Sequence, residues 1–456
     1  MRLYLINPSN PLVTIVTKKK SFWNLFRVWK PLSLMTIAGL TPTDWDVSIF
    51  DENLSVPDYK TLPRPDLVGI TAFTSQANRA YEISAYFRQH GVPVVMGGIH
   101  ATMCKDEAIT RVDSVVAGEA ESVWTQLLDD FKNNELKQVY KGEHTDLKGV
   151  PSSRHDILPI KYIFGAIQTT RGCPLDCNFC SVSAFNGRKY RQRPIPDIIE
   201  EFRLIPEKRV LIVDDNLIGT RTEHIERSKE LFRAMIKAKL KKNWIGQVTI
   251  NFGDDEELLK LASKSGCKGV FIGFETPTKE GLLELRKKIN LTKGRDIRKS
   301  VRQIQKYGIL VMGSFMMGLD IDVSGIGKRI ADIAIQYQMD YINVLFLTPF
   351  PGTNLWDKMK SEGRIFLNRF PDDWKYYTLT IPAAKYKQLS FDDIISEMES
   401  CYLRYYSFFR ILHRVWDNLL HCRQPLVAFF GNLATKSNLH ANDKIYEEIK
   451  VLIEKQ

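Results

Sequence analysis

Short apolar segments alternate with helical patterns from residue 2 to residue 353 of this 456-residue chain, and this alternation constrains the fold more than any other feature. Strands that are connected through helices pair in parallel and carry the helices on the faces of the sheet. The alternation is interrupted at residues 146–165, where prolines and polar residues show no periodicity. The pattern therefore predicts an α/β protein with two successive sheets joined by a linker.

The first run predicts a doubly wound, Rossmann-like sheet over residues 1–145. Its strands are expected at residues 2–7, 47–51, 67–71, 93–96 and 114–117, and its helices at 32–40, 76–90 and 121–131. Ligands of such sheets bind at the carboxyl ends of the strands. The candidate cofactor-binding residues at these ends are Asn7, Thr71, Gly97, Gly98, Gly118 and Glu119. The paired glycines would let a bulky ligand approach the backbone closely, or they only make a tight turn between strand and helix.

The second run predicts six strand–helix units within residues 166–375. Its strands are expected at residues 162–169, 209–213, 244–251, 269–275, 309–317 and 341–347. Chemistry in a barrel of such units gathers at the carboxyl ends of the strands. Glu275 ends the fourth strand, and a carboxylate there is costly to bury without a partner, which makes it the best site candidate. Asp215 follows the second strand, where it either contacts a ligand or caps the local backbone.

Three cysteines with C-x3-C-x2-C spacing follow the first strand of the second run. Cys173, Cys177 and Cys180 share one predicted loop, and thiolates at this spacing can hold three corners of an iron–sulfur cube. The fourth iron would stay open to a substrate or cofactor, as in catalytic metal sites. Chance, an incomplete zinc site or an unrelated cluster are the alternatives for the triplet alone. The preceding strand, the Arg-Gly pair and Phe179 before the last cysteine favour the cube.

These residues resemble the signature of the radical S-adenosylmethionine (SAM) enzymes, and the six strand–helix units are similar to the partial (β/α)6 barrel of that family. In the family, the open iron chelates the amino and carboxylate groups of SAM, and an electron splits SAM into methionine and a 5′-deoxyadenosyl radical. The resemblance implies one [4Fe-4S] cluster on the cysteine triplet and contacts of Glu275 and Asp215 with SAM. Asp214-Asp215-Asn216 stands where the family typically has Gly-Gly-Glu.

Residues 1–145 resemble the cobalamin-binding domain that precedes many radical SAM barrels. The similar stretches are residues 96–100 and 116–121. The Asp-x-His-x-x-Gly motif, whose histidine binds cobalt from below in other cobalamin proteins, is absent, as it often is in the radical SAM subgroup. The resemblance therefore implies a corrin without a protein histidine ligand. His100 lies in the right region, but its position outside that motif favours a packing or hydrogen-bonding role.

The whole pattern resembles the cobalamin-binding radical SAM group that includes hopanoid methylases and the anaerobic magnesium-protoporphyrin cyclase. The resemblance implies methyl transfer to an unactivated carbon of a large apolar substrate, either a lipid or a tetrapyrrole. It also implies three cofactors, a [4Fe-4S] cluster, SAM and cobalamin, and a one-electron reductant such as flavodoxin or ferredoxin. A cyclase, oxidase or rearrangement enzyme with the same cofactors is the alternative within the group. An iron–sulfur sensor or binding protein is the alternative outside it.

Cysteine usage and charge predict a cytoplasmic protein with a basic surface. Seven cysteines without a pairing pattern argue against a disulfide framework, and neither a signal peptide nor a membrane-spanning run is expected. The formal charge of +11 suits an acidic cofactor, anionic lipid or nucleic acid, or it reflects only a soluble basic surface. Because no basic stripe of a known nucleic-acid fold is present, no nucleic-acid partner is expected.

Two segments mix cations with aromatic side chains. One is residues 18–30, and the other is residues 402–416 in a predicted C-terminal helical region at 376–456. Such segments either lie on a membrane surface, which would make the protein peripheral, or pack against the protein itself. The apolar run at residues 425–430 is too short to span a bilayer and has the same two interpretations.

Overall fold

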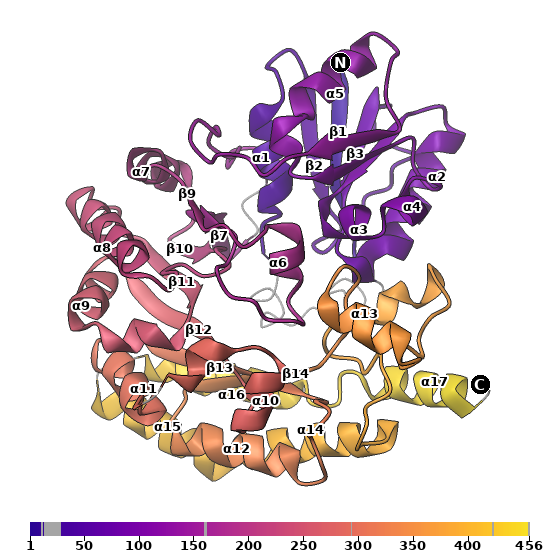
Figure 1. Ribbon diagram of the computed structural model, residues 1–456. Coiled ribbons are helices and arrows are strands. Elements are labelled where there is room, and N and C mark those ends of the chain that lie inside the picture. The colour runs from indigo at the N-terminus through magenta and orange to yellow at the C-terminus, as the bar shows by residue number, and fades with distance from the viewer. Residues whose placement is uncertain (11, 13–28, 159–161, 293, 422–423, 455–456) are drawn as a thin grey trace.

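Two parallel sheets lie one above the other in the computed structural model of the chain, with helices around them (Figure 1). The structure describes residues 1–456 except 11, 13–28, 159–161, 293, 422–423 and 455–456. Among the described residues, every helix is too short or too polar to cross a lipid bilayer. The predicted α/β architecture with C-terminal helices is confirmed. The predicted boundaries at residues 145, 165 and 375 stay predictions.

The first sheet runs in the order β2–β1–β3–β4–β5–β6, and all of its strand pairs are parallel. Its strands are β1 (Arg2–Asn7), β2 (Asp46–Asp51), β3 (Leu67–Thr71), β4 (Val94–Gly97), β5 (Ser114–Gly118) and β6 (Val139–Gly142). Its helices are α1 (Leu32–Leu40), α2 (Ala77–Gln89), α3 (Gly98–Met103), α4 (Lys105–Ala108) and α5 (Trp124–Lys132). The sequence did not predict β6, because its four residues include a lysine and a glycine and show no strand pattern.

Each buried strand of this sheet contributes to two hydrophobic cores, as parallel strands do when helices cover both faces. In β1, Tyr4 and Ile6 pack in one cluster with α2, while Leu3 and Leu5 pack in another with α1 and α5. The near-continuous apolar run of β1 follows from this double burial. Polar and glycine residues are therefore left to the strand ends, and the carboxyl end is the one at which parallel sheets bind ligands.

The second sheet runs in the order β7–β10–β11–β12–β13–β14 and is also parallel. Its strands are β7 (Phe164–Ile167), β10 (Arg209–Ile212), β11 (Asn243–Val248), β12 (Cys267–Glu275), β13 (Leu310–Met317) and β14 (Tyr341–Phe346). Its helices are α6 (Ser181–Phe185), α7 (Ile195–Leu204), α8 (Thr222–Lys237), α9 (Glu256–Lys264), α10 (Lys279–Glu284), α11 (Ile297–Lys306), α12 (Ile326–Gln336) and α13 (Asn354–Ser361). In the described part of the chain β7 and β14 do not pair, so the sheet is a partial barrel.

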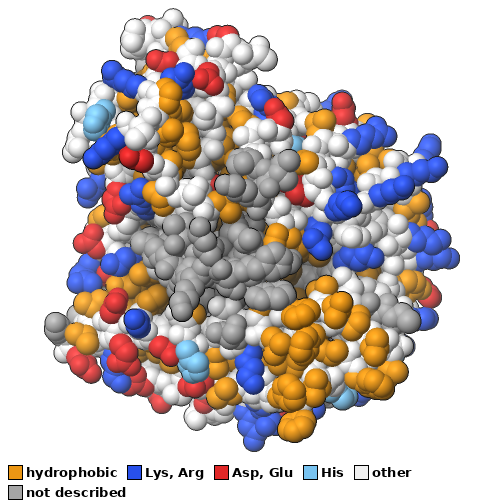
Figure 2. Space-filling view, turned by 180° about the vertical axis from the view of Figure 1, so that it is seen from behind, with side chains coloured by type: hydrophobic (Ala, Val, Ile, Leu, Met, Phe, Trp, Pro, Cys, Tyr) orange, Lys and Arg blue, Asp and Glu red, His pale blue; other side chains and the backbone are white. Residues whose placement is uncertain are grey.

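Four helices follow: α14 (Phe391–Tyr405), α15 (Phe408–Leu420), α16 (Pro425–Ser437) and α17 (Asp443–Glu454). The predicted C-terminal helical region is interrupted at residues 406–407, between α14 and α15. Of the predicted aromatic stripe, Tyr405 and Tyr406 are buried, whereas Phe408, Phe409 and Trp416 are exposed. Exposed hydrophobic side chains gather on the surface where α15 and α16 lie (Figure 2).

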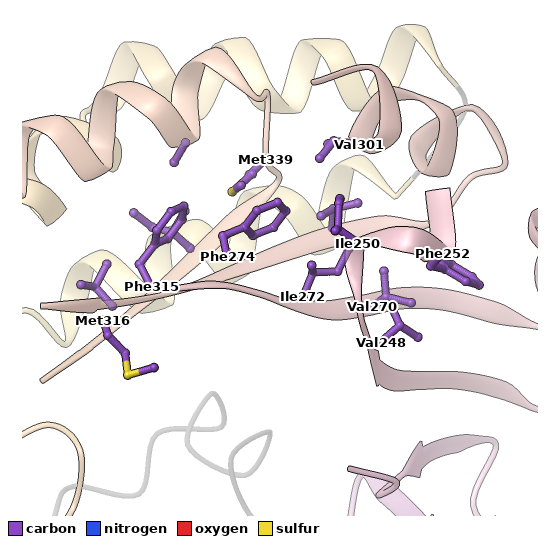
Figure 3. Close-up of a cluster of buried hydrophobic side chains, with 14 of the residues drawn as sticks. Val248, Ile250, Phe252, Val270, Ile272, Phe274, Val301, Phe315, Met316 and Met339 are labelled. Carbon is purple, nitrogen blue, oxygen red and sulfur yellow. The ribbon is translucent and has the colours of Figure 1, made fainter. Parts of the chain in front are cut away.

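The two faces of the second sheet differ in burial. Phe274 of β12 and Phe315 of β13 point toward the helices and pack near Met339 (Figure 3). On the other face, the alternate side chains Gln247, Phe271, Met312, Ser314, Asn343 and Leu345 are only half-buried or exposed. The residues alternate in this way because successive side chains of a strand point to opposite faces. The partial barrel therefore has one packed face and one inner face whose alternate side chains are not fully buried.

An ion-pair cluster joins the carboxyl ends of the two sheets. Glu119 follows β5 and contacts Arg171 at 2.9 Å and Arg191 at 2.5 Å. The two arginines belong to the short antiparallel hairpin of β8 (Thr170–Arg171) and β9 (Arg191–Gln192), which brackets the cysteine loop. Arg171 also contacts Glu121 at 2.7 Å. This cluster holds the strand ends of the first sheet against the loop that carries the cysteines.

Candidate active site

Cys173, Cys177 and Cys180 lie on one loop between β8 and α6, as the spacing predicts. Gly172 begins the loop with φ +85°, a conformation that L side chains rarely adopt. A Cβ atom there would also lie 2.4 Å from the Lys189 carbonyl oxygen, so only glycine fits. The Arg-Gly pair before the first cysteine therefore has two separate structural tasks. The glycine allows the sharp turn into the loop, and the arginine ties the loop to the first sheet.

Burial and nearby charges act in opposite directions on the three thiols. Burial raises their pKa values, to about 12 for Cys177. The Lys287 ammonium lowers the pKa of each thiol, and the backbone N–H of Leu175 does the same for Cys173. The charge of the Cys180 thiolate also raises the pKa of its neighbours in the loop, Cys173 and Cys177. Thiols in such a place are deprotonated by a bound cation, because the metal favours the thiolate.

The donor set fits an iron–sulfur cube better than a single ion. Among the described residues, no three His, Cys, Asp or Glu side chains converge as ligands of one ion. The cysteines of a cube bind different irons, so their sulfur atoms do not need to converge. Cys267 cannot be a fourth ligand, because it begins β12, about 25 Å along the strand from Glu275. Cys104 and Cys401 lie on other elements, so the cysteines of the described part of the chain leave one corner of a cube without a thiolate.

Glu275 ends β12 in a buried ion pair. Its carboxylate contacts the Lys287 ammonium at 2.7 Å, and both side chains are almost fully buried. Burial alone would lower the pKa of Lys287, but the Glu275 carboxylate and the nearby thiols of Cys177 and Cys180 raise it above its ordinary value. Glu275 also has φ +68°, which is strained for a residue with a side chain. The partner that a buried carboxylate requires is therefore Lys287, which also lies beside the cysteines.

Two aspartates that follow β10 accept hydrogen bonds from residues at the start of the cysteine loop. Asp214 accepts hydrogen bonds from the hydroxyl and backbone N–H of Thr169 and from the hydroxyl of Thr170, and its burial raises its pKa to about 6. Asp215 accepts from the Gly172 N–H and from Asn186, each at 3.0 Å. Burial also raises the pKa of Asp215. Asp215 therefore has the capping role that the sequence left as an alternative, and its contact with SAM stays a prediction.

The strand ends of the first sheet bring most of the predicted cofactor-binding residues to one edge. Gly98 has φ +88°, and a Cβ atom there would lie 2.7 Å from Thr71 Oγ1. Gly118 has φ +97°, and its Cβ would lie 2.1 Å from the Gly142 carbonyl oxygen. At Gly98 and Gly118, the positive φ and the close neighbouring atoms leave no room for a side chain, so the turns themselves require glycine. Gly97 is different, because its Cβ would meet nothing nearer than Val116 at 3.8 Å.

Three further residues of this domain make internal contacts. Asn7 donates to Asp51 at 2.9 Å and accepts from Gln76. Burial raises the pKa of Glu119, but the hydrogen bond from Arg191 and the charge of Arg171 outweigh it and lower that pKa overall. His100 is buried and shares a hydrogen bond of 2.9 Å with Tyr81, which is the packing role that the sequence favoured. Cofactor contacts of Asn7 and Glu119 stay predictions.

The two strand-end edges meet beside the cysteine loop. Helix α3, which begins at Gly98, contacts α6, which begins immediately after Cys180 (Figure 1). Met103 at the end of α3 also packs against Gly352 in the loop after β14, where a Cβ atom would lie 2.3 Å from its sulfur. The turn at Gly97 and Gly98 and the cysteine loop are therefore neighbours, although they are far apart in the sequence.

Two family models match the chain in the order in which the two sheets occur. The model of the radical SAM superfamily matches residues 167–323, which include the cysteine triplet and Glu275. The model of the B12 binding domain matches residues 24–128, which include Thr71, Gly97 and Gly118.

Several curated relatives that match most of the chain are methyltransferases by name. Bacteriochlorophyllide d C-12(1)-methyltransferase of Chlorobaculum tepidum is 31% identical over 362 residues, which are 76% of this chain and 76% of that protein. The chain belongs to the cobalamin-binding radical SAM methyltransferase family. Bacteriochlorophyllide d C-8(2)-methyltransferase of the same organism is 29% identical over 92% of this chain and 94% of its own length. Hopanoid C-2 methylase of Rhodopseudomonas palustris is 27% identical over 74% of this chain and 65% of its own.

A solved structure confirms the fold of this radical SAM enzyme. The radical SAM methyltransferase of Kitasatospora setae, with cobalamin and a [4Fe-4S] cluster bound, has a TM-score of 0.63 and 17% sequence identity. The likeness covers 79% of this chain and 78% of that one. The predicted resemblance and the three predicted cofactors, a [4Fe-4S] cluster, SAM and cobalamin, are confirmed at the level of the family.

Lys287, Arg171 and Arg191 are the site residues whose roles sequence reasoning missed. Lys287 occurs within the run Arg286-Lys287-Lys288, where nothing distinguishes it from a surface cation. Its burial follows only from the fold, which places it between Glu275 and the cysteine loop. The carboxylate that binds both arginines, Glu119, belongs to the other sheet and lies more than 50 residues earlier in the chain.

Replacing Cys173, Cys177 or Cys180 by alanine is expected to remove the [4Fe-4S] cluster, because each holds a separate corner. Each variant is reconstituted anaerobically, and its iron and sulfide contents are measured. Cys267→Ala is the matched control, since Cys267 is buried in the same sheet but lies at the far end of its strand. Cluster loss in a correctly folded Cys267→Ala, together with a cluster retained in Cys177→Ala, would contradict the assignment.

Replacing Lys287 by methionine is expected to destabilise the protein, because it leaves the buried Glu275 carboxylate without a partner. Such a break typically costs about 3–5 kcal/mol. The double variant Lys287→Met/Glu275→Gln carries no unpaired buried charge and should recover most of that loss. Urea unfolding of the cluster-free parent protein, the single variant and the double variant measures their free energies of unfolding. Lys288→Met is the control, because Lys288 is an adjacent exposed lysine. Equal midpoints for Lys287→Met and Lys288→Met would show that the pair adds no stability.

Proposed function

We propose that this enzyme transfers a methyl group to an unactivated carbon atom of a large apolar substrate, a tetrapyrrole or a lipid. One observation carries the proposal. The contact between α3 and α6 brings the cysteine loop next to the turn at Gly97 and Gly98. Methyl transfer needs both cofactors beside one substrate carbon, whereas an iron–sulfur sensor needs no second cofactor edge at its cluster. The arrangement therefore favours the enzyme over the sensor.

The residues of the second sheet would have distinct tasks in this reaction. The cysteine triplet holds the cluster, and Glu275, oriented by Lys287, contacts SAM together with Asp215. When bound, the cluster with SAM supplies radical chemistry, and cobalamin supplies a methyl carrier. Side chains of the inner face, such as the exposed Gln247 and the half-buried Asn343, orient the substrate and keep water away from the reacting atoms.

The residues of the first sheet would hold cobalamin without a histidine below the metal. His100 is engaged by Tyr81 and has no exposed surface, so it is not offered to a ligand. We assign the corrin to the edge formed by the strand ends, with Asn7, Thr71 and Gly97 in contact with it. Gly98, Gly118 and Glu119 shape that edge through their turns and ion pairs.

The proposed substrate class rests on the names of the relatives. Two of them act on bacteriochlorophyllide d and one on a hopanoid, and these molecules are large and largely apolar. A cyclase, oxidase or rearrangement enzyme with the same cofactors is the second candidate, because such enzymes need the same two edges. The relatives' methyltransferase names favour methyl transfer.

A one-electron reductant and a membrane surface are the proposed partners. A small acidic electron carrier such as flavodoxin or ferredoxin would suit the formal charge of +11. Peripheral membrane contact would give access to a lipid or tetrapyrrole. The cationic and aromatic segment predicted for this contact, residues 18–30, lies outside the described residues except for Trp29 and Lys30. Lys30 is buried against Glu207 at 2.6 Å and is not available to lipid.

Replacing Gly97 by phenylalanine is expected to weaken cobalamin binding by about tenfold or more, because the ring would occupy the edge assigned to the corrin. Gly97→Ala is the matched control, since its Cβ atom would make only ordinary contacts. Hydroxocobalamin is titrated into the full-length protein, and the visible spectrum gives the dissociation constant. Thermal unfolding checks that both variants are folded. Equal affinity of the two variants would place the corrin elsewhere.

Anaerobic turnover with labelled SAM tests the proposed reaction. The reconstituted enzyme, a chemical reductant, cobalamin and methyl-labelled SAM are incubated with bacteriochlorophyllide d or with a hopanoid, and the products are analysed by mass spectrometry. The expected result is a labelled methyl group on the substrate, together with both 5′-deoxyadenosine and S-adenosylhomocysteine. Formation of 5′-deoxyadenosine with a changed but unlabelled substrate would favour a cyclase, oxidase or rearrangement enzyme. Absence of any SAM cleavage would favour a sensor.

A further inference from the structure

Helix α15 exposes most of its large apolar side chains and buries two polar ones beside Ile411, unlike an ordinary surface helix. Phe409 is 83% exposed and Trp416 is 61% exposed, and they occur with other exposed side chains at helical spacing: Phe408, Leu412, Leu419 and Leu420. The opposite face carries Arg414 and Asn418, which are buried, the latter with no exposed surface at all. A surface helix normally turns its apolar stripe toward the core and its polar residues toward water.

Hydrogen bonds fix this orientation. The Arg414 guanidinium donates to Asn432 Oδ1 at 2.7 Å and to the Tyr405 carbonyl oxygen at 3.0 Å. Asn418 donates to Asp340 Oδ1 at 2.9 Å, and Asp340 also accepts from the Val311 N–H of β13. Turning α15 to bury its aromatic side chains would break these bonds and leave a buried guanidinium unpaired, which is strongly unfavourable. The apolar face is therefore held outward by the sheet itself.

The exposed apolar face continues onto α16. Helices α15 and α16 pack against each other, and Leu426 and Val427 at the start of α16 are 71% and 52% exposed. Figure 2 shows hydrophobic side chains gathered in one broad patch where these two helices lie. Large contiguous apolar patches on soluble proteins mark interaction sites. We name the exposed side chains of α15, with Leu426 and Val427, the α15–α16 patch.

The charges on the two helices that form the patch indicate what covers it. Residues 406–442 contain a single carboxylate, Asp417, and Arg302 binds it at 2.9 Å. The exposed cations Arg410 and Lys436 lie on the same two helices, and the whole chain carries +11. Basic residues beside apolar ones suit the surface of an anionic bilayer. A second copy of this basic chain would instead bring like charges together.

We propose that the α15–α16 patch is a membrane-docking face, which inserts its apolar side chains between the headgroups of an anionic bilayer and leaves Arg410 and Lys436 at the lipid phosphates. The two helices lie in the plane of the interface, because neither is long enough to span the membrane. The proposal deepens the proposed function by naming where an apolar substrate is reached. It does not depend on which reaction follows.

Liposome flotation of the full-length protein tests the docking face. Vesicles of neutral phosphatidylcholine are compared with vesicles that also contain phosphatidylglycerol, each at low and high salt. The parent protein is expected to float with the anionic vesicles, and less so at high salt, because salt screens surface charges. Phe409→Ser/Trp416→Ser is expected to reduce the bound fraction by about tenfold or more, because two apolar side chains lose their burial in lipid.

Matched variants separate docking from folding and from catalysis. Leu283→Ser/Val323→Ser also removes two exposed hydrophobic side chains, but away from the patch, and should float like the parent. SAM cleavage by Phe409→Ser/Trp416→Ser in detergent should equal that of the parent. If Phe409→Ser/Trp416→Ser loses both flotation and SAM cleavage, that variant is misfolded. Arg410→Glu then tests the docking face, and it should float less than the parent while it cleaves SAM normally.

Two results would overturn the proposal. One is a parent protein that stays with the soluble fraction for every vesicle and salt concentration. The other is a concentration-dependent dimer, measured by light scattering without lipid, that Phe409→Ser/Trp416→Ser dissociates while flotation is unchanged. The patch would then be an interface between two copies. Failure of the turnover assay leaves this test unaffected, because flotation needs neither substrate nor cofactors.

Discussion

One buried carboxylate holds the two halves of this enzyme in register. Glu119 lies between the guanidinium groups of Arg171 and Arg191, which would repel each other without it. Removing one partner of a buried pair typically costs about 3–5 kcal/mol, which is a large part of the 5–15 kcal/mol that stabilises a whole domain. The arginines belong to the hairpin that brackets the cysteine loop, and Glu119 follows a strand of the other sheet. The distance between the cysteine loop and the strand ends of the first sheet therefore depends on this contact.

Backbone with positive φ at the strand ends is the second requirement of the site. Gly98, Gly172 and Glu275 all have positive φ, and each lies where a strand or hairpin turns into the following loop or helix. For Gly98 and Gly172 the surrounding atoms also exclude a side chain. Glu275 has no such freedom, and its buried bond to Lys287 offsets the strain. The turns that admit cofactors are therefore stabilised by packing and ion pairs around them.

The sequence predicted the strands and the position of the cysteine loop well, because both depend on local pattern. Five strands of the first sheet agree with prediction to within one residue, and the cysteine spacing needs no tertiary information. The pairing of side chains could not be predicted, because it joins residues that are far apart in the chain. Glu119 reaches Arg191 over 72 residues, and Lys287 is one of three adjacent cations until the fold buries it. The short strand β6 was missed because its four residues carry no pattern.

The aromatic stripe after residue 400 shows most clearly what a pattern leaves undecided. Helical spacing fits a buried face and an exposed face equally well, and both occur: Tyr405 is buried, and Phe409 is exposed. Two hydrogen-bond acceptors decide which face of α15 is buried. Asp340 accepts from Asn418, and Asn432 accepts from Arg414. Asp340 also accepts from β13, so α15 is tied directly to the sheet whose other strands carry Glu275 and the cysteine loop. Any surface that binds α15 and α16 would therefore hold the inner face of that sheet in a fixed orientation.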